Sequence, residues 1–423
     1  MGSAMKKKQI IILGAGISGL SLAYFLSKQN KWDVLVLEKN QKAGGWIKSQ
    51  VSQGFLFEHG PRTFLLSKCK HILQLSQELN LEQEIVYSHP EGRGKYLWIQ
   101  GSLKKVPIWT WSLIKALLKE WRVPCAPGDE SVWDFACRRF NPTVAHHFFD
   151  PMVTGIYAGD IRKLSMEACF PTLKMWERTW GSITRGLWKM RGRQSSHLFT
   201  FRKGIQSLVD ELEKQSSAQF HYGEEVSHIA FKGEKVFIKA AKEYEADYLF
   251  SALPCHIVGK LIDPEFLQIP LRGATVVNLG YRESVLDKNG YGYLVSSEEK
   301  EKVLGVVFDS KAFPREGEGT KLTVMLKDLN LKKEEALEIA LDALSRHLNI
   351  QAWPNVYDVT YAPQAFPQME TGHITKMQTL ESKLKSQYPR LRLVGNYLYG
   401  VGVEDCVARA KSVSESFFRA VES

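Results

Sequence analysis

The sequence lacks most features that would place it in a specialised class of protein. Its six cysteines include no Cys-x-x-Cys pair, so they fit neither a disulfide framework nor a zinc site and favour a reducing, cytoplasmic compartment. No run of about 18 or more apolar residues occurs, which excludes a simple transmembrane helix. A Gly-x-Ser-x-Gly elbow, a P-loop lysine and metal-spaced histidines are also missing. Serine hydrolases, kinases and metal-dependent enzymes are therefore disfavoured.

Negative charge is in deficit. There are 56 lysines and arginines against 46 acidic residues, which gives a formal net charge of +10 and a pI near 9.1. This balance fits a solvated basic surface, an anionic substrate or an anionic membrane surface. Nucleic acid is disfavoured as a partner, because the chain has no zinc-finger spacing, no RNP-type motif and no continuous basic arm. With 423 residues and 44% hydrophobic content, the chain is a folded protein of two or three domains.

The N-terminal segment carries the pattern of a dinucleotide-binding unit. An apolar run at residues 9–13 predicts a buried parallel strand, and it leads directly into Gly14, Gly16 and Gly19, spaced as Gly-x-Gly-x-x-Gly. The helix predicted to follow would present its N-terminal amides to a phosphate. A second strand ends at Glu38, whose carboxylate suits a ribose 2′-hydroxyl and would repel a 2′-phosphate. The unit predicts an adenine dinucleotide and leaves NAD and FAD open.

Two further features favour FAD. The loop after Glu38 continues through Lys42 and the pair Gly44-Gly45, an extension that suits a long, permanently bound flavin. Near the C-terminus, a strand ending at Gly395 is followed by the turn 400–402 and a predicted helix. The N-terminus of that helix would face the N1/C2 carbonyl region of a flavin, where negative charge develops on reduction. We therefore predict FAD as the cofactor.

Pattern changes along the chain predict three domains. A Rossmann-like α/β domain that binds FAD is discontinuous and comprises residues 5–87, 197–252 and 375–423. Residues 253–374 contain short β-branched segments and one amphipathic helix, which predicts an antiparallel sheet that binds substrate; a purely supporting sheet fits the same pattern. Residues 88–196 are helical, basic and rich in tryptophan, and they form the third domain.

The helical domain suggests a membrane hypothesis. In the stretch 106–122, polar and basic side chains share one helical face, namely Ser112, Lys115, Lys119 and Arg122. Apolar side chains lie around the rest, namely Ile114, Leu117, Leu118 and Trp121. An interfacial helix and a core helix with snorkelling lysines both fit this arrangement. Residues 173–193 repeat the basic and aromatic texture, which suits a substrate route or a solvated face. We expect a cytoplasmic protein, with peripheral contact at the inner face of the cell membrane as one hypothesis.

Motifs along essentially the whole chain resemble those of the protoporphyrinogen oxidases, within the broad amine-oxidase-like FAD superfamily. In the N-terminal part the resemblance is carried by GAGISGLSLAYFL, LEKNQKAGGWIKS and FEHGPRTF. Farther along it is carried by GIYAGDIRKLSMEACFPTL, FRKGIQSLVDEL, ADYLFSALP, GYGYLVSSEE, LGVVFDSKAFP, FPQMETGH and VGNYLYGVGVEDC. A tryptophan after the glycine pair is more typical of this family than of its amine-oxidising relatives.

The resemblance assigns candidate site residues. The implied flavin contacts are Gly14, Ala15, Gly16, Ile17, Ser18, Gly19, Glu38, Lys39, Lys42, Gly44, Gly45, Trp46, Gly60, Pro61, Arg62, Thr63, Val226, Ile374, Gly395, Val401, Gly402 and Val403. The implied porphyrin contacts are Lys95, Tyr291, Leu294 and Val307, with the backbone near Tyr157 and Gly159. Two positions depart from the family's pattern: Lys95 stands where relatives carry an arginine that pairs with a propionate, and Tyr291 stands where they carry phenylalanine. Lysine is a point charge and not a bidentate fork, so the propionate contact differs.

The resemblance also implies an activity. It is the FAD-dependent, six-electron oxidation of protoporphyrinogen IX to protoporphyrin IX in haem biosynthesis, with oxygen as acceptor and hydrogen peroxide as product. No protein acid or base is assigned, because the cation left by hydride loss is strongly delocalised and the cofactor carries the redox step. The alternatives are coproporphyrinogen III oxidation to coproporphyrin III, a flavin amine oxidase, and an FAD-binding protein without turnover. The oligomeric state stays open, with a homodimer among the options.

Overall fold

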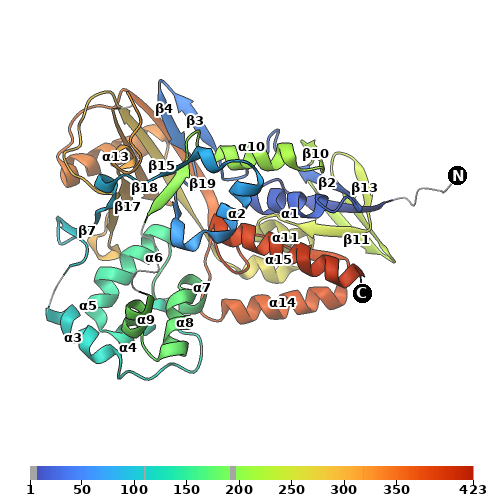
Figure 1. Cartoon of the computed structure of the whole chain (residues 1–423), viewed down its shortest axis with the longest axis horizontal. Coiled ribbons are helices and arrows are strands. Elements are labelled where there is room, and N and C mark those ends of the chain that lie inside the picture. Colours follow the sequence, from blue (N-terminus) through green and yellow to red (C-terminus); the bar gives the residue numbers. More distant parts are fainter. Residues whose placement is uncertain (1–6, 109–110, 191–196, 318, 423) are drawn as a thin grey trace.

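The computed structural model describes residues 7–108, 111–190, 197–317 and 319–422. In Figure 1 a parallel sheet with its helices occupies the right, an antiparallel sheet the upper left and a helical unit the lower left. The predicted class, α/β with an added antiparallel sheet and helices, is confirmed. Within the described residues, no helix combines the length and apolar character needed to cross a membrane.

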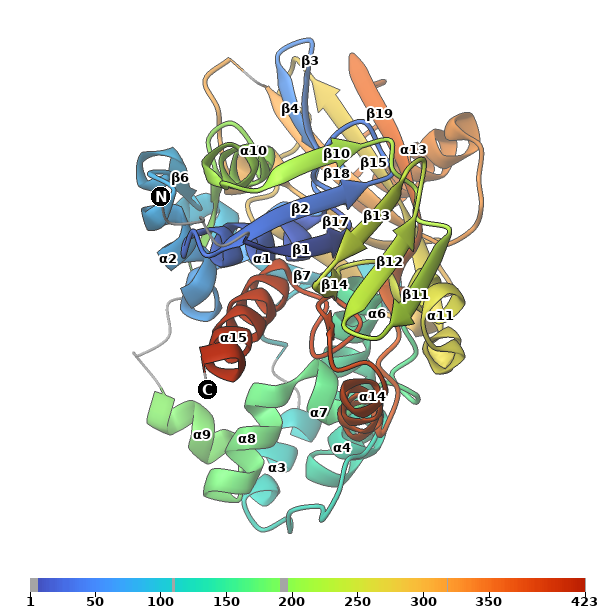
Figure 2. The same ribbon diagram turned by 90° about the vertical axis from the view of Figure 1, so that its right-hand side faces the viewer.

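The parallel sheet has five strands in the order β10-β2-β1-β14-β20. They are Gln219–Tyr222, Trp32–Glu38, Lys8–Leu13, Tyr248–Ser251 and Leu391–Leu393. All four pairings are parallel, and the central strands end in runs of buried, mostly β-branched and leucine side chains. Apolar residues on both faces of these strands are expected when helices or other layers cover both sides. The order of β10, β2 and β1 can be followed in Figure 2.

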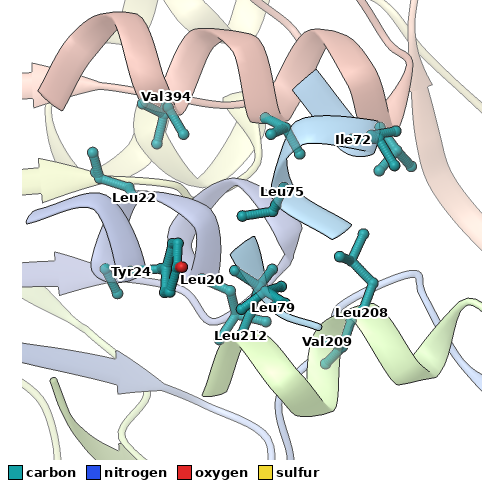
Figure 3. Close-up of a cluster of buried hydrophobic side chains, with 14 of the residues drawn as sticks. Leu20, Leu22, Tyr24, Ile72, Leu75, Leu79, Leu208, Val209, Leu212 and Val394 are labelled. Atoms are coloured by element: carbon teal, nitrogen blue, oxygen red, sulfur yellow. The ribbon is translucent and has the colours of Figure 1, made fainter. Parts of the chain in front are cut away.

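Each face of this sheet has its own core. One face is covered by four helices, α1 (Ile17–Ser27), α2 (Lys70–Glu78), α10 (Gln206–Gln215) and α15 (Val403–Glu422). Figure 3 shows Leu20 of α1, Leu75 of α2 and Leu212 of α10 converging in this core. The other face is covered by a three-stranded meander and two helices, which are β11 (His228–Lys232), β12 (Lys235–Lys239), β13 (Glu243–Ala246), α11 (Cys255–Leu261) and α14 (His373–Gln387).

The second large sheet has seven strands in the order β19-β15-β18-β17-β16-β7-β8. They are Val356–Pro367, Leu271–Tyr281, Thr320–Lys327, Val303–Val307, Gly292–Val295, Lys95–Ile99 and Ser102–Lys105. All neighbours are antiparallel except β16 and β7. Helix α13 (Lys333–Leu348) packs on one face, as the amphipathic pattern predicted. The five strands predicted between residues 273 and 362 are all present.

One stretch differs from the sequence prediction. Residues 95–105, assigned to the helical segment 88–196, form β7 and β8 at the edge of the seven-stranded sheet. Buried and exposed side chains do not alternate in this stretch, because the consecutive residues Leu97, Trp98 and Ile99 are all buried. The strand therefore lacks the period-two signal by which a half-exposed strand is recognised. The division into three domains otherwise stays a prediction.

The remaining elements form the helical unit and short connecting sheets. The helical unit contains α3 (Trp111–Glu120), α4 (Val132–Arg139), α5 (Pro142–Val144), a π-helix (Ala145–Phe149), α6 (Asp150–Tyr157), α7 (Met166–Cys169), α8 (Pro171–Trp180) and α9 (Ile183–Met190). Two small sheets consist of β3 (Ser49–Ser52) with β4 (Phe55–Glu58), and of β5 (Phe64–Leu65), β9 (Leu198–Phe201) and β6 (Ile85–Tyr87). Helix α12 (Asp309–Ala312) follows β17. Within the helical unit, α6 is the helix that packs against the seven-stranded sheet (Figure 1).

Candidate functional site

The glycine turn between β1 and α1 has three different steric environments. Gly14 has a φ of +92°, a conformation that side-chain-bearing residues rarely adopt. A Cβ on Gly19 would lie 1.9 Å from the Gly14 carbonyl oxygen, so only glycine allows the helix to approach the turn. A Cβ on Gly16 would meet no protein atom within 4 Å. The space in front of the α1 N-terminus is thus left open at the position where a pyrophosphate would lie.

Glu38 is held beside this turn at the end of β2. Its carboxylate accepts hydrogen bonds from the Ala15 amide at 2.8 Å and from the Asn40 amide and side chain at 2.9 and 2.7 Å. The side chain is buried, whereas the neighbouring Lys39 is exposed. A carboxylate fixed at this point suits the ribose of an adenine dinucleotide, as predicted.

The second glycine pair lies directly against the first turn. The Gly44 amide donates to the Ala15 carbonyl at 2.8 Å, and a Cβ on Gly45 would lie 3.2 Å from the Gly16 Cα. Gly44 and Gly45 both have positive φ values, +125° and +60°. The extended loop therefore forms one wall of the same open space. Lys42 and Trp46 are exposed on this loop.

The turn Gly60–Thr63 is the third wall. A Cβ on Gly60 would lie 2.0 Å from the Trp46 carbonyl oxygen, so this turn can pack against the loop that carries Trp46 only if residue 60 is glycine. Before the turn, Glu58 accepts from the Ser49 hydroxyl at 2.7 Å and the Ile205 amide at 2.9 Å. Burial raises the pKa of Glu58, and these hydrogen bonds act in the opposite direction.

The C-terminal turn completes the site. Gly395 has a φ of +150°, and α15 begins at Val403 after a turn in which the Gly402 amide donates to the Asp405 carboxylate at 3.0 Å. Val401 and Ile374 pack against the core of the helical unit. Val226 packs instead against the core on the meander side of the parallel sheet. The turn therefore lies where the parallel sheet, its helices and the helical unit meet.

A group of polar side chains joins the turn at residues 60–63, called the flavin turn below, to the seven-stranded sheet. We name this group the polar seam; it consists of Arg62, Asp309, Thr323 and Asn278. Arg62 and Asp309 form an ion pair at 3.5 Å, and both side chains are largely buried. The Thr323 hydroxyl lies 2.8 Å from the Asp309 carboxylate and 2.9 Å from the Asn278 side-chain oxygen. The Asn278 amide donates back to the Glu58 carbonyl at 3.1 Å. Beside the seam, the Thr63 and Tyr291 hydroxyls lie 2.8 Å apart.

The strand register brings three of the predicted porphyrin contacts to one face of the sheet. Gly292 pairs with Lys95 on one side and with Val307 on the other, so these side chains point the same way. Leu294, two residues farther along β16, shares that face. A Cβ on Gly155 of α6 would lie 2.4 Å from a Leu294 methyl carbon, which shows that this face meets α6.

Two predicted contacts lie on and just after α6. The Tyr157 hydroxyl donates to the Cys169 carbonyl at 2.8 Å, so its side chain points into the helical unit and only its backbone is turned to the sheet. The Tyr157 carbonyl accepts from the Gln368 side chain at 2.9 Å. A Cβ on Gly159 would lie 2.5 Å from the same Gln368 side chain. Contacts with bound cofactor or substrate stay predictions for all of these residues.

Tyr291 and Lys95 are the two positions that depart from the family's pattern. Tyr291 precedes β16; its amide donates to the Gly94 carbonyl at 2.6 Å, and its carbonyl accepts from the Phe308 amide at 2.8 Å. Burial raises the pKa of the Tyr291 hydroxyl, so it stays protonated. Lys95 is exposed, and no ion pair involves it in the part of the chain that the structure describes. The Lys95 ammonium group is therefore available to pair with the carboxylate of a bound ligand.

Sequence reasoning named Arg62 but missed the other residues of the polar seam and Gln368. Asp309 stands two residues after the end of the buried strand β17, inside the quoted segment LGVVFDSKAFP, and a polar residue at this position could have indicated the site. Asn278 and Thr323 sit in the middle of buried strands, where no local pattern reveals which polar side chain has a partner. Among the described residues, no three histidine, cysteine or acidic side chains are grouped so as to hold a metal ion.

Comparison with known proteins agrees with this geometry. The family described as "Flavin containing amine oxidoreductase" matches residues 17–416. Protoporphyrinogen oxidase of Bos taurus is 29% identical to this chain over 466 residues, covering 96% of the chain and 98% of the relative. Coproporphyrinogen III oxidase of Bacillus subtilis is 26% identical, covering 96% of the chain and 97% of the relative.

Solved structures share the fold. A crystal structure of a protein from Exiguobacterium sp. is 21% identical and covers 98% of this chain with a TM-score of 0.88. A UDP-galactopyranose mutase, 13% identical, covers 99% of the chain with a TM-score of 0.77. At these identities the likeness concerns the fold alone. The fold and the three glycine-lined walls together fit FAD.

Proposed function

The chain belongs to the family of flavin-containing amine oxidoreductases, and on that premise we propose that it oxidises protoporphyrinogen IX to protoporphyrin IX in haem biosynthesis. FAD supplies the hydride acceptor for this reaction. Removal of three hydrides and three protons takes six electrons from the substrate, and three O₂ become three H₂O₂. The relatives named above act on porphyrinogens, and they match this chain along nearly its whole length.

The observation that carries the proposal is the composition of the sheet face next to the flavin turn. That face carries the apolar side chains of Leu294 and Val307 together with two lysines, the exposed Lys95 and the half-buried Lys104. A flat, apolar macrocycle with a carboxylate at its edge matches this combination. A protonated amine would meet Lys95 with like charge, so the amine-oxidase alternative is disfavoured.

The roles of the residues follow from their positions. Lys95 pairs with a propionate of the substrate as a point charge. The Tyr291 ring and Leu294 hold the macrocycle, and the Thr63 hydroxyl fixes the Tyr291 ring relative to the flavin turn. The polar seam keeps the turn and the sheet in register, so that the substrate and the flavin are presented to each other at a constant distance.

Coproporphyrinogen III is the second candidate substrate. It carries four carboxylates instead of two, and the Bacillus subtilis relative is named for it. A tetracarboxylate requires several unpaired cations around the macrocycle. Near the site Arg62 is already paired with Asp309, whereas Lys95 is exposed and has no ion pair among the described residues. We keep the dicarboxylate as the first candidate because the Bos taurus relative, named for it, is 29% identical to this chain against 26% for the Bacillus subtilis relative.

The test is a direct comparison of the two porphyrinogens with purified, flavin-loaded protein in air. Porphyrin fluorescence is followed for each, beside a no-enzyme control, because porphyrinogens oxidise spontaneously. We expect kcat/KM to be at least about tenfold higher for protoporphyrinogen IX. Coproporphyrinogen III brings additional carboxylates into the site, and one carboxylate left without a cationic partner accounts for a factor of about this size. A higher kcat/KM for coproporphyrinogen III would identify that compound as the substrate in place of protoporphyrinogen IX. If the protein accelerated the oxidation of neither compound, the porphyrinogen proposal would be overturned.

Lys95 variants refine the same test. Lys95→Met should raise KM about tenfold with little change in kcat, because a uniform binding contact is lost. Lys95→Arg restores the charge and is the matched control. If Lys95→Met left KM unchanged, the carboxylate contact would have to lie elsewhere.

We also propose that the protein is cytoplasmic and touches the inner face of the cell membrane through α3. One side of α3 is buried through Leu113 and Ala116, whereas Ile114, Leu118 and Trp121 are exposed beside the cations. A core helix with snorkelling lysines would bury these side chains, so the interfacial alternative is favoured. The side chain of Ser112 and residues 109, 110 and 191–196 lie outside the described residues.

A further inference from the structure

The helices α3 and α9 expose a group of large apolar side chains. Their exposed fractions are 78% for Trp111, 68% for Leu118, 47% for Trp121, 53% for Leu187 and 74% for Trp188. Single exposed apolar side chains are ordinary, but tryptophans and leucines gathered on two neighbouring helices mark an interaction surface. Both helices lie at the end of the molecule opposite the meander (Figure 1).

The same two helices carry cations that have no acidic partner among the described residues. They are Lys115, Lys119, Arg122, Arg185 and Lys189, and all are exposed. The cations of the adjoining helices behave differently, because Arg138, Arg139, Lys174 and Arg178 are all paired with glutamates. On α3 and α9 the unpaired positive charge therefore lies together with the exposed apolar side chains.

An open hollow of about 640 Å³ lies on this surface where the two helices meet. It is lined by Leu117, Leu118, Lys119, Trp121, Arg122, Thr184, Arg185 and Trp188. The guanidinium groups of Arg122 and Arg185 lie 5.3 and 5.5 Å from the centre of the Trp121 ring. The planar fork of a guanidinium matches the oxygens of a phosphate, and the tryptophan ring keeps the two forks at the hollow. We use the name α3–α9 groove for this hollow.

The groove is fixed in shape by buried charges behind it. Glu120, the last residue of α3, accepts from the Ile183 and Thr184 amides at the start of α9, at 2.8 and 3.2 Å. Arg139 contacts Glu120 at 3.3 Å and Glu177 at 2.7 Å, and all three side chains are fully buried. A buried network of this kind holds α3 and α9 at one separation, so the groove is formed before any ligand arrives.

We propose that the α3–α9 groove binds the phosphate headgroup of an anionic glycerophospholipid, with Arg122 and Arg185 on the phosphate and Trp111, Leu118 and Trp188 in the acyl region. This deepens the membrane contact proposed above and rests on it. A free phosphate would leave the apolar rim in water, whereas a lipid covers the rim and neutralises the cations together. The ligand is therefore a lipid of the bilayer and not a soluble anion.

The test uses flavin-loaded, full-length protein and sedimented vesicles of equal size. One set is pure phosphatidylcholine and the other contains about 30% phosphatidylglycerol, at the same ionic strength. We expect at least about tenfold tighter binding to the anionic vesicles. Arg122→Glu and Arg185→Glu should each weaken that binding about fivefold or more, since each cation near an anionic surface contributes about this factor.

Matched variants separate the contributions. Lys242→Glu changes the net charge by the same amount in the β12–β13 turn, at the far end of the molecule (Figure 1), and should leave binding within about twofold. Trp188→Gln should weaken binding to both kinds of vesicle. Flavin absorbance and thermal unfolding of every variant confirm that the fold is retained, since the changed side chains are exposed.

The outcomes are distinguishable from failure of the proposed reaction. Equal binding to both vesicle types, or charge reversals with no more effect than Lys242→Glu, would overturn the headgroup site while the membrane contact stands. No binding to either vesicle would overturn both. Porphyrinogen oxidation, measured on the same preparation in detergent without vesicles, is unaffected by these results and is judged separately.

Discussion

Replacing Gly16 with alanine should separate ligand binding from folding. The backbone at Gly16, with φ −72° and ψ 176°, suits alanine, and the new methyl group meets no protein atom within 4 Å. The free energy of unfolding of the flavin-free protein should therefore change by less than about 1 kcal/mol. With FAD, the methyl group occupies the space of the pyrophosphate and removes at least one charge-assisted hydrogen bond, a loss of about 2–3 kcal/mol. FAD should bind about 30- to 150-fold more weakly.

The assay is a titration of flavin-free protein with FAD, followed by the flavin fluorescence, together with thermal unfolding of the flavin-free proteins. Gly19→Ala is the contrasting variant, because its Cβ would lie 1.9 Å from the Gly14 oxygen and the fold itself should lose more than about 3 kcal/mol. Wild-type FAD affinity in Gly16→Ala would refute the reasoning, because the open space would then not be the pyrophosphate site. A flavin-free Gly16→Ala protein that unfolds several degrees early would refute it equally.

Three further predictions concern the buried charges and the substrate face. Arg139→Met leaves the fully buried Glu120 without its cation and removes one of the cations paired with Glu177, so it should lower the urea-derived free energy of unfolding by about 3–5 kcal/mol; a loss below about 1 kcal/mol would contradict this. Burial opposes ionisation of Glu177, but hydrogen bonds from three neighbouring cations lower its pKa to about 2. Because this folded-state pKa lies below the unfolded value, the contribution is complete above about pH 5 and lost as the pH falls toward 2. Glu177→Gln should thus flatten the fall in stability between about pH 5 and 2, and a parallel curve would exclude the assignment. Tyr291→Phe keeps the ring and loses only the 2.8 Å contact with the Thr63 hydroxyl, so kcat/KM should fall less than about fivefold. Tyr291→Ala also removes the ring, and its kcat/KM should fall more than about tenfold. If both variants lost the same amount of kcat/KM, the hydroxyl and not the ring would be the important group.

The parallel sheet and the glycine turn could be predicted because their causes are local in sequence. A strand buried on both faces needs an uninterrupted apolar run, and residues 9–13 and 34–37 supply it. The need for glycine at positions 14 and 19 follows from a turn and a close approach that the structure confirms. The amphipathic pattern of residues 332–348 likewise predicted α13.

The rest could not be predicted, because its causes lie between distant segments. Strand β7 pairs with β16, almost two hundred residues farther along the chain, and nothing in its own sequence indicates that partner. Arg62 meets Asp309 only after two sheets have been docked against each other. The ion pairs of Arg139 arise from three helices, and a sequence rich in both charges does not reveal which side chains become buried.

The discontinuous parallel sheet has a consequence for how the protein is made. A chain emerges from the ribosome N-terminus first, so the phosphate turn at residues 14–19 exists long before β20 and the turn at residues 395–403. Until then β14 has an open edge, and the flavin site lacks its C-terminal wall. Capture of the cofactor is accordingly one of the last events of biogenesis. A bound flavin therefore indicates that translation has passed the turn at residues 395–403 and that α15 has packed against α1.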